Sequence, residues 1–428
     1  MRLYLTLLLA ALPLAAQQQH DMANMPGMAH EAAAQAEPME ASGTGINPAS
    51  SPMNMARFSA GRWTFFAHGL AFVTEIQQTG PRGADKLASM NWFMGEAEHG
   101  LGGGTFSVRS MLSLEPITVS DRRYPELFQT GETAFGVPIV DGQHPHNFVM
   151  ELALSYSHPL SAKTSWEVYV APVGDPALGP VAFPHRVSAA ELPQATLAHH
   201  LEDSTHISHD VVTAGLTHGI FRVEASGFHG GEPDENRWTI AYGAIDSWSS
   251  RVTVSPNANW TGQISAGRLT RPEALETGDQ VRTTASVTYN RPYARGNWAT
   301  SMIWGRVHKT ALQDDLNGYT LESVLRFTRK NYITGRMEQV DKDELLPGGG
   351  VFRVEAYTAG YTRDFYFVPR IATGLGGNIT AYSIPAELRH AYGQHPIAVL
   401  IFLRFKLQDA SPPPQSASSS YGQVEGRP

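Results

Sequence analysis

The sequence predicts an all-β protein: a single transmembrane antiparallel β-barrel of about sixteen strands, with fourteen to eighteen compatible with the pattern. Three observations predict this fold. Apolar and polar residues alternate with a period of two through most of 62–407, many alternating runs reach nine to twelve residues, and short connections alternate with long ones. Helical i, i+3, i+4 stripes are scarce, so the body of the chain is expected to be almost entirely strand.

The alternation assigns side chains to the two faces of each strand. In 221–227, Val223 and Ala225 fall on one face, whereas Arg222 and Glu224 fall on the other. The same pattern predicts lipid-facing positions for four more residues: Val287, Ile397, Val399 and Ile401. It also predicts that Arg404 points inward. Apolar side chains pointing to lipid and polar ones pointing inward are typical of a transmembrane barrel.

Strand length separates a membrane barrel from a soluble sheet. The longest alternating runs are 62–76, 85–95, 104–114, 147–157, 281–290, 296–306, 352–363 and 396–407. Strands of soluble sheets average about five to six residues, whereas tilted bilayer-crossing strands need about nine to eleven. Tryptophans near the ends of many runs predict aromatic girdles, namely Trp63, Trp92, Trp166, Trp248, Trp260, Trp298 and Trp304.

The connections predict which ends of the strands face which side. Short ones are 158–163, 217–219, 256–259, 291–296 and 329–331; long ones are 115–146, 174–208, 229–244, 270–280, 307–318, 340–351 and 375–395. On this pattern residues 62–407 resemble an outer-membrane β-barrel of the porin type. The resemblance implies a bacterial outer membrane, surrounding lipid, periplasmic tails and extracellular long loops. The chain departs from many such barrels by continuing past Phe405.

The two ends of the chain have a different composition. Residues 1–16, MRLYLTLLLAALPLAA, have the layout of a signal peptide, 17–61 form a predicted disordered periplasmic tail, and 408–428 form a Pro/Ser-rich tail. The chain has no cysteine, which excludes disulfides and thiolate metal sites. A net charge of -8 gives no positive field that would attract nucleic acid. After the signal peptide no segment has eighteen consecutive apolar residues, which excludes a helical membrane protein.

The stretch HDMANMPGMAH, residues 20–30, concentrates soft metal ligands in the predicted tail. Thioethers prefer Cu(I), and imidazoles suit Cu(II), Zn or Ni. The candidate ligands are His20, Met22, Met25, Met28 and His30. The tail resembles that of copper resistance protein B, an outer-membrane protein whose N-terminal region is rich in Met and His. This resemblance implies copper as the first metal, ahead of other divalent ions, and periplasmic metal-handling proteins as partners. The alternative is a plain linker.

A second set of candidate ligands lies in the longest connections. Eight of the seventeen histidines fall in 141–209. Seven of these histidines are candidate metal ligands: His144, His146, His185, His199, His200, His206 and His209. Four carboxylates lie between them in the sequence: Asp141, Glu202, Asp203 and Asp210. Divalent ions take such mixed sets. The alternative is that these side chains only brace the loops by hydrogen bonds.

The sequence favours a channel or binding protein for small polar solutes or metal ions. It is also compatible with a role in the handling of copper or other heavy metals. Enzyme signatures are absent: HEAAA at 30–34 has Ala34 where a zincin has its second histidine, and no G-x-S-x-G occurs. We therefore predict no enzyme and no required cofactor. The alternatives are a secreted all-β binding module of the sandwich or lectin type, and an outer-membrane hydrolase.

Overall fold

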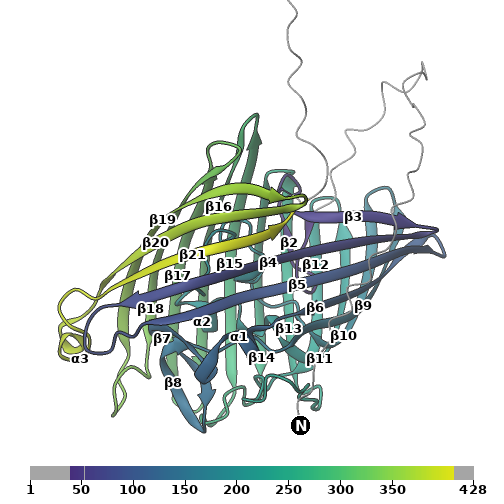
Figure 1. Ribbon diagram of the computed structural model, residues 1–428. Helices are drawn as coiled ribbons and strands as arrows, with labels where there is room; N and C mark the ends of the chain where they lie inside the picture. The colour runs from purple at the N-terminus through teal and green to yellow at the C-terminus, as the bar shows by residue number, and fades with distance from the viewer. Residues whose placement is uncertain (1–38, 53, 409–428) are drawn as a thin grey trace, which may run out of the picture. The chain divides into compact units, whose positions relative to one another are not determined.

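The computed structural model describes residues 39–52 and 54–408, and its main feature is a closed antiparallel barrel (Figure 1). Sixteen strands run the length of the wall: β4 (Trp63–Gln78), β5 (Lys86–Leu101), β6 (Gly104–Leu112), β9 (Val149–Ser161), β10 (Thr164–Gly174), β11 (Ser208–His218), β12 (Phe221–His229), β13 (Ser247–Asn257), β14 (Trp260–Leu269), β15 (Gln280–Tyr293), β16 (Gly296–Lys309), β17 (Asp314–Arg326), β18 (Asn331–Lys342), β19 (Phe352–Val368), β20 (Ile371–Ser383) and β21 (Ile397–Leu407). The ring closes where β21 pairs with β4, from Ala398 opposite Gln78 to Lys406 opposite Leu70. The predicted fold and strand number are confirmed.

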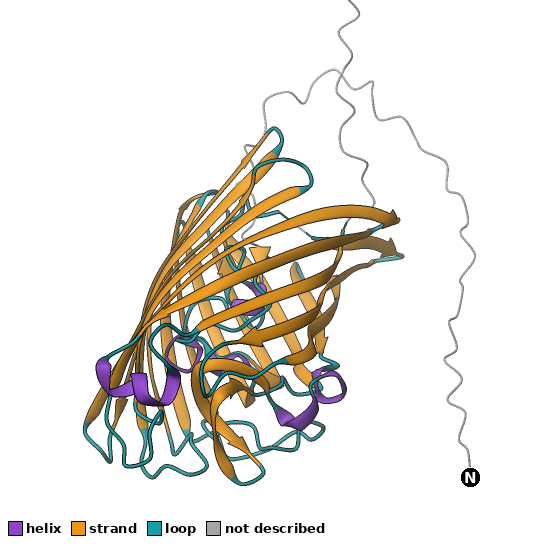
Figure 2. Ribbon diagram, turned by 60° about the vertical axis from the view of Figure 1, so that its left-hand side comes forward, coloured by secondary structure: helices purple, strands orange, loops and turns teal. Residues whose placement is uncertain are grey.

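Short turns join the strands at one end of the barrel and mostly longer connections join them at the other (Figure 2). The two longest connections are 113–148, between β6 and β9, and 175–207, between β10 and β11. The predicted long loop 307–318 is wrong. β16 and β17 both extend further than the alternation suggested, which leaves only the turn 310–313. Among the described residues, none of the helices has the length and apolar character needed to cross a bilayer.

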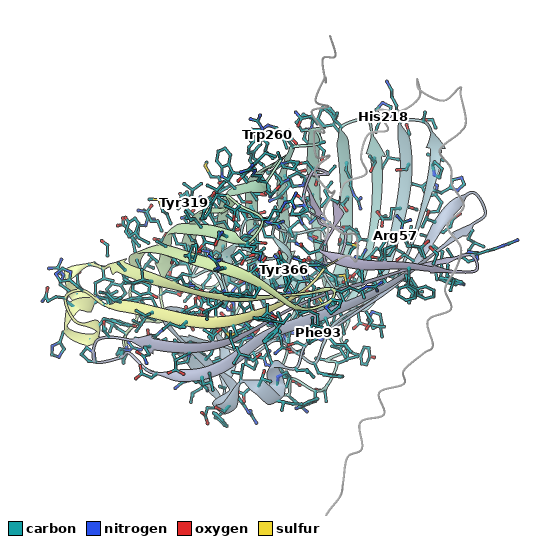
Figure 3. All side chains as sticks on the ribbon, turned by 45° about the horizontal axis from the view of Figure 1, so that its top comes forward. Arg57, Phe93, His218, Trp260, Tyr319 and Tyr366 are labelled. Carbon is teal, nitrogen blue, oxygen red and sulfur yellow. The ribbon has the colours of Figure 1, made fainter. Side chains whose placement is uncertain are left out.

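The two faces of the wall differ in polarity as the alternation predicted. Val223, Val287 and Ile401 are exposed on the outside, whereas Glu224 and Arg404 are buried on the inside. Figure 3 shows side chains on both faces, and the labelled Phe93, Trp260, Tyr319 and Tyr366 are large exposed side chains. A soluble sandwich would bury one face of each sheet in a dry core, so the alternative of a secreted binding module is wrong.

Aromatic rings gather near the short turns. Tyr289 lies between Trp260 and Trp298, with ring centroids 4.6 and 5.5 Å away. Amphipathic rings at this level are typical of a membrane interface. Trp92 is an exception to the predicted girdle: it points into the barrel, is only 5% exposed, and packs among buried interior residues.

The barrel begins earlier than the predicted boundary at residue 62. β3 (Met55–Ala60) pairs with the first half of β4, and residues 41–51, with the small hairpin β1 (Met39–Glu40) and β2 (Ile46–Asn47), precede it. Residues 41–51 are mostly buried. Arg109 Nη1 donates to the carbonyl oxygens of Ala41 and Gly43, and Gly43 N donates to Glu151 Oε1 at 3.0 Å. A polar segment can be ordered here because its partners are polar wall residues.

Three segments, which we call the plug, occupy the barrel interior: residues 41–51, 175–207 and the buried parts of 113–148, whose residues 120–123 and 135–138 are exposed. Residues 113–148 contain α1 (Glu115–Thr118), η1 (Ser120–Arg122) and the hairpin β7 (Tyr124–Ala134) and β8 (Val137–Gln143). Residues 175–207 contain η2 (Phe183–His185), α2 (His199–Glu202) and η3 (Ser204–His206). The loop before β21 carries η4 (Ala386–Leu388) and α3 (Arg389–Tyr392). Apolar plug residues such as Leu197 and Leu201 pack against Val307 and Val340 of the wall.

Val287→Arg should destabilise the barrel by about 2–4 kcal/mol in lipid vesicles, because it places a charge on the lipid face near the middle of β15. Val351→Arg is the matched control. Both valines are 48% exposed, but Val351 lies in the loop before β19. Denaturant titration of the two folded variants measures the difference. Equal free energies of unfolding would contradict a lipid-facing position for Val287.

Candidate metal centre

The short helix α2 lies directly against the wall, where the strands carry two facing glycines. Gly305 of β16 is paired with Gly318 of β17. A Cβ atom on Gly305 would come within 2.2 Å of the Leu201 carbonyl oxygen, and one on Gly318 within 2.8 Å of the Ala198 Cβ. The absence of these two side chains lets α2 touch the backbone of the wall. That contact fixes where His199 and His200 stand.

Three histidines from the two long plug segments meet at this place. One possible ligand nitrogen from each of His144, His199 and His200 lies within 4.8 Å of the others. The ring centroids of His199 and His200 are 5.0 Å apart, and those of His144 and His200 are 5.6 Å apart. Both ring nitrogens of His200 are buried with no hydrogen-bond partner among the described residues. Gly131 gives this ring its space, since a Cβ there would lie 2.5 Å from His200 Cε1.

A hydrogen bond orients the His199 ring, and a carboxylate lies beside the His144 ring. His199 Nδ1 donates to Asp203 Oδ1 at 2.6 Å, which leaves the Nε2 lone pair of His199 available. Asp203 is held in turn by Arg186 Nη1 at 2.8 Å, and Arg186 Nε donates to Glu322 Oε1 of the wall at 2.5 Å. His144 Nε2 lies 2.9 Å from Glu132 Oε1, which brings a carboxylate to the edge of the cluster.

Burial and neighbouring charges shift the pKa values of His200 and Glu132 in directions that favour metal binding. Burial, with the neighbouring His199 and His144, holds the pKa of His200 well below its usual value. Burial alone would raise the pKa of Glu132, but Arg237 and His144 outweigh it and hold that pKa below the usual range. Neutral imidazole and ionised carboxylate are the forms that bind metal ions. At neutral pH His200 and Glu132 are therefore in their binding forms.

Two more of the predicted histidines extend the cluster. The His206 ring centroid is 5.2 Å from that of His199 and 5.4 Å from that of His146. His146 Nδ1 is 2.9 Å from Glu115 Oε1. Burial, with His199 and His146, lowers the pKa of His206 to about 3. His206 Nε2 is buried and without a hydrogen-bond partner among the described residues.

The remaining predicted ligands are elsewhere. His185 lies beside Trp92 and Met111, and His209 stands on β11 opposite His229. Among the predicted carboxylates, Asp203 belongs to the cluster, whereas Asp141 pairs with Arg82 and Asp210 accepts from Gly243 N. His20, Met22, Met25, Met28 and His30 lie outside the described residues.

Sequence reasoning missed Glu132, Glu115 and Arg186. Each is one of many charged residues in the chain, and no local pattern marks it. The signal that could have pointed to Arg186 is its place in FPHR, next to the predicted ligand His185. Glu132 and Glu115 become partners of the histidines only because the long segment 113–148 folds back inside the barrel.

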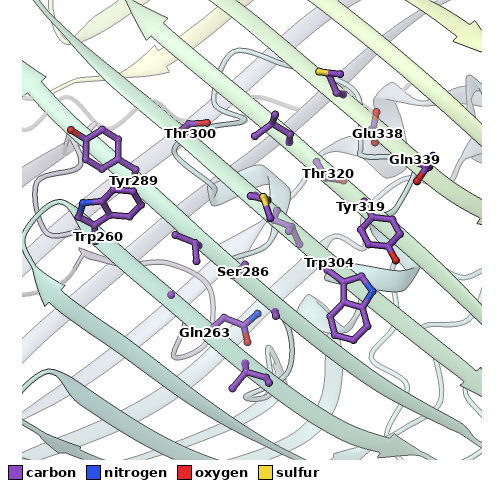
Figure 4. Close-up of a pocket in the computed structure, with 18 of the residues that line it drawn as sticks. Trp260, Gln263, Ser286, Tyr289, Thr300, Trp304, Tyr319, Thr320, Glu338 and Gln339 are labelled. Carbon is purple, nitrogen blue, oxygen red and sulfur yellow. The ribbon is translucent and has the colours of Figure 1, made fainter.

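Two cavities on the inner wall are small, whereas one of about 520 Å³ lies between the β4–β5 loop and segment 113–148. Cavities of about 70 and 30 Å³ lie along the inner wall near Trp92. A much larger concavity, about 1030 Å³, is lined mainly by apolar residues of β13–β19 that include Trp260, Val287 and Tyr319 (Figure 4). These side chains point outward. The concavity therefore belongs to the lipid-facing surface rather than to the histidine cluster.

Comparison with solved structures identifies the barrel type. An anion-selective porin from Comamonas acidovorans matches 81% of this chain and 100% of its own length, at 11% identity and a TM-score of 0.52. This chain has the porin barrel fold. OmpF of Salmonella typhi and the channel DcaP of Acinetobacter baumannii each match 82% of this chain and 100% of their own, at 9% and 7% identity and TM-scores of 0.49 and 0.48. No family model and no curated protein matches the sequence. The porin fold and the apolar outer face place the protein in a bacterial outer membrane.

Arg186→Met should destabilise the folded barrel by about 3–5 kcal/mol, because Asp203 and Glu322 would keep buried charges without their shared partner. Arg353→Met is the control. Arg353 also pairs with a carboxylate, Asp341 at 2.7 Å, but its side chain is 51% exposed. Such an exposed pair contributes about 0–1 kcal/mol. Denaturant unfolding of both variants in vesicles measures this, and a similar small loss for both would contradict a structural role for Arg186.

Proposed function

We propose that the protein binds a divalent transition-metal ion inside its plug and handles that metal at the outer membrane. The observation that carries the proposal is the convergence of His144, His199 and His200, with ligand nitrogens within 4.8 Å of one another. Three imidazoles with a nearby carboxylate suit Zn²⁺, Cu²⁺ or Ni²⁺. Glu132 supplies that carboxylate beside His144.

The unpartnered nitrogens favour metal binding over simple bracing of the loops. A histidine that only braces a loop uses its ring nitrogens in hydrogen bonds. His200 uses neither nitrogen, and His206 uses only one, within the described residues. A buried polar atom without a partner costs about 1–3 kcal/mol. A bound ion would offset that cost at His200.

The filled interior favours a small cargo over a large one. The porin fold supports a channel for small solutes, yet the inner cavities near Trp92 measure only about 70 and 30 Å³. These volumes hold a few water molecules at most. An ion can be passed between fixed ligands in such an interior, whereas a sugar-sized solute would require the plug to move. A hydrolytic role has no specific observation in its favour.

Purified protein should bind one Zn²⁺ or Cu²⁺ at this site, and His200→Gln should weaken that binding at least tenfold by removing one nitrogen ligand. Both measurements use a background in which His20 and His30 are glutamine, so that the tail does not contribute. Equilibrium dialysis with elemental analysis reports affinity and stoichiometry. His390→Gln, an exposed histidine of α3, is the control and should change nothing. Equal affinity for His200→Gln and His390→Gln would refute the site.

We further propose that copper is the metal handled and that the N-terminal stretch His20–His30 collects it as Cu(I) for exchange with periplasmic proteins. The support is the residue composition, with three thioethers and two imidazoles in eleven residues. Replacing Met22, Met25 and Met28 by leucine keeps their bulk and removes the sulfurs. Competition with a Cu(I) chelator should show weaker binding by the full chain. Unchanged Cu(I) affinity would mean that the stretch is a linker.

A further inference from the structure

Three potential soft ligands form a row on the inner face of the wall, away from the histidine cluster. In the strand register His68 of β4 is opposite Met94 of β5, and Met94 is opposite Met111 of β6. Directly opposed residues on antiparallel strands have Cβ atoms about 4.5–5.5 Å apart. The imidazole and the two thioethers are therefore neighbours across three consecutive strands.

A fourth ligand reaches this row from the plug. His185 Nε2 lies 3.0 Å from Met111 Sδ, and both side chains are buried. The backbone carbonyl of His185 accepts a hydrogen bond from Asn47 Nδ2 at 3.1 Å, which ties η2 to the N-terminal plug segment. The loop is thus fixed at the point where the imidazole meets the sulfur.

An indole ring completes the surroundings. The Trp92 ring centroid is 4.2 Å from that of His185 and 4.6 Å from that of His68. A cavity of about 70 Å³ is lined by His68, Trp92 and His185 but not by Met94 or Met111, so space for an ion exists on the imidazole side of the row. A cation near the face of an indole ring is stabilised by the negative potential of that face.

The nearby charges disfavour a divalent ion more strongly than a monovalent one. Glu191, the carboxylate that lines this cavity, is paired with Arg404 and lies 3.2 Å from Lys406 Nζ. Arg186, Arg326 and Lys406 line the cavity as well. No carboxylate of the cavity lining is left to neutralise a second positive charge, so a divalent ion would be opposed. Neutral thioethers and imidazoles prefer Cu(I).

We propose that Met111, His185, Met94 and His68, beside Trp92, form a binding site for Cu(I), with Ag(I) as a redox-inert equivalent. This site shares no residue with the proposed centre at His144, His199 and His200 and does not depend on it. The two sites differ in chemistry: imidazole with carboxylate at the first, and thioether with imidazole at the second. An interior with both could hold copper in either oxidation state.

Ag(I) binding to the full chain tests this site without a reductant. The background carries leucine at Met22, Met25 and Met28, so that the N-terminal stretch does not dominate the measurement. Replacing Met94 and Met111 by leucine in this background keeps side-chain volume and removes two sulfurs. We expect the loss of one bound Ag(I) equivalent, or at least a tenfold weaker affinity, by competition titration. The control replaces Met302 and Met337, both exposed on the outer wall, and should behave as the background.

Further measurements keep the test decisive if the double variant fails to assemble, as judged by heat-dependent mobility on a gel. His185→Gln should then show the same loss of Ag(I). X-ray absorption of the Ag(I)-loaded background should show sulfur and nitrogen scatterers together. Unchanged Ag(I) stoichiometry and affinity in the methionine variant overturns the proposal, as does a metal environment without sulfur. Loss of Zn²⁺ binding in His200→Gln has no bearing on either result.

Discussion

The guanidinium of Arg186 links the plug to the wall, and the shape of the interior depends on that link. It bridges Asp203 in the plug and Glu322 on β17, with all three side chains almost fully buried. The same Asp203 carboxylate accepts from Phe183 N and His199 Nδ1, so one group fixes both η2 and α2. Desolvation makes a buried ion pair costly, and its main benefit is that it specifies one arrangement. Here the arrangement it specifies is the approach of the histidines to one another.

The plug provides polar partners for the inner face of the wall, which the alternation of the strands makes polar. A wall with apolar residues facing lipid carries polar and charged residues on its inner face, and these need partners once water is excluded. The plug supplies them largely from backbone groups and from side chains of opposite charge, as Gly43 does for Glu151 and Arg186 does for Glu322. Imidazole nitrogens that this pairing leaves without hydrogen bonds among the described residues, above all those of His200, can bind another group.

The wall could be predicted from sequence because its signal is local. The run 281–290 and the observed strand β15 (Gln280–Tyr293) differ by only a few residues at either end. The ordered segment 41–51 could not be predicted, because a polar composition is typical of disordered segments and its polar partners on the wall could not be known from the sequence. The histidine cluster was predicted only from the number of histidines in 141–209. That number could not distinguish His200, which belongs to the cluster, from His209, which lies on the wall. The row of His68, Met94 and Met111 gave no signal, since its members lie on three different strands.

The position of residues 41–51 also restricts how the molecule can be assembled. These residues precede β4 in the chain yet lie inside the ring that β4 helps to close. Once Ala398–Lys406 of β21 has paired with β4, the wall offers no lateral opening through which a segment could enter. The simplest route is that the N-terminal segment and the loop 175–207 gather against the unfinished sheet first. The β21–β4 pairing, made by the last of the described strands, then encloses them, so that closing the wall also fixes its contents.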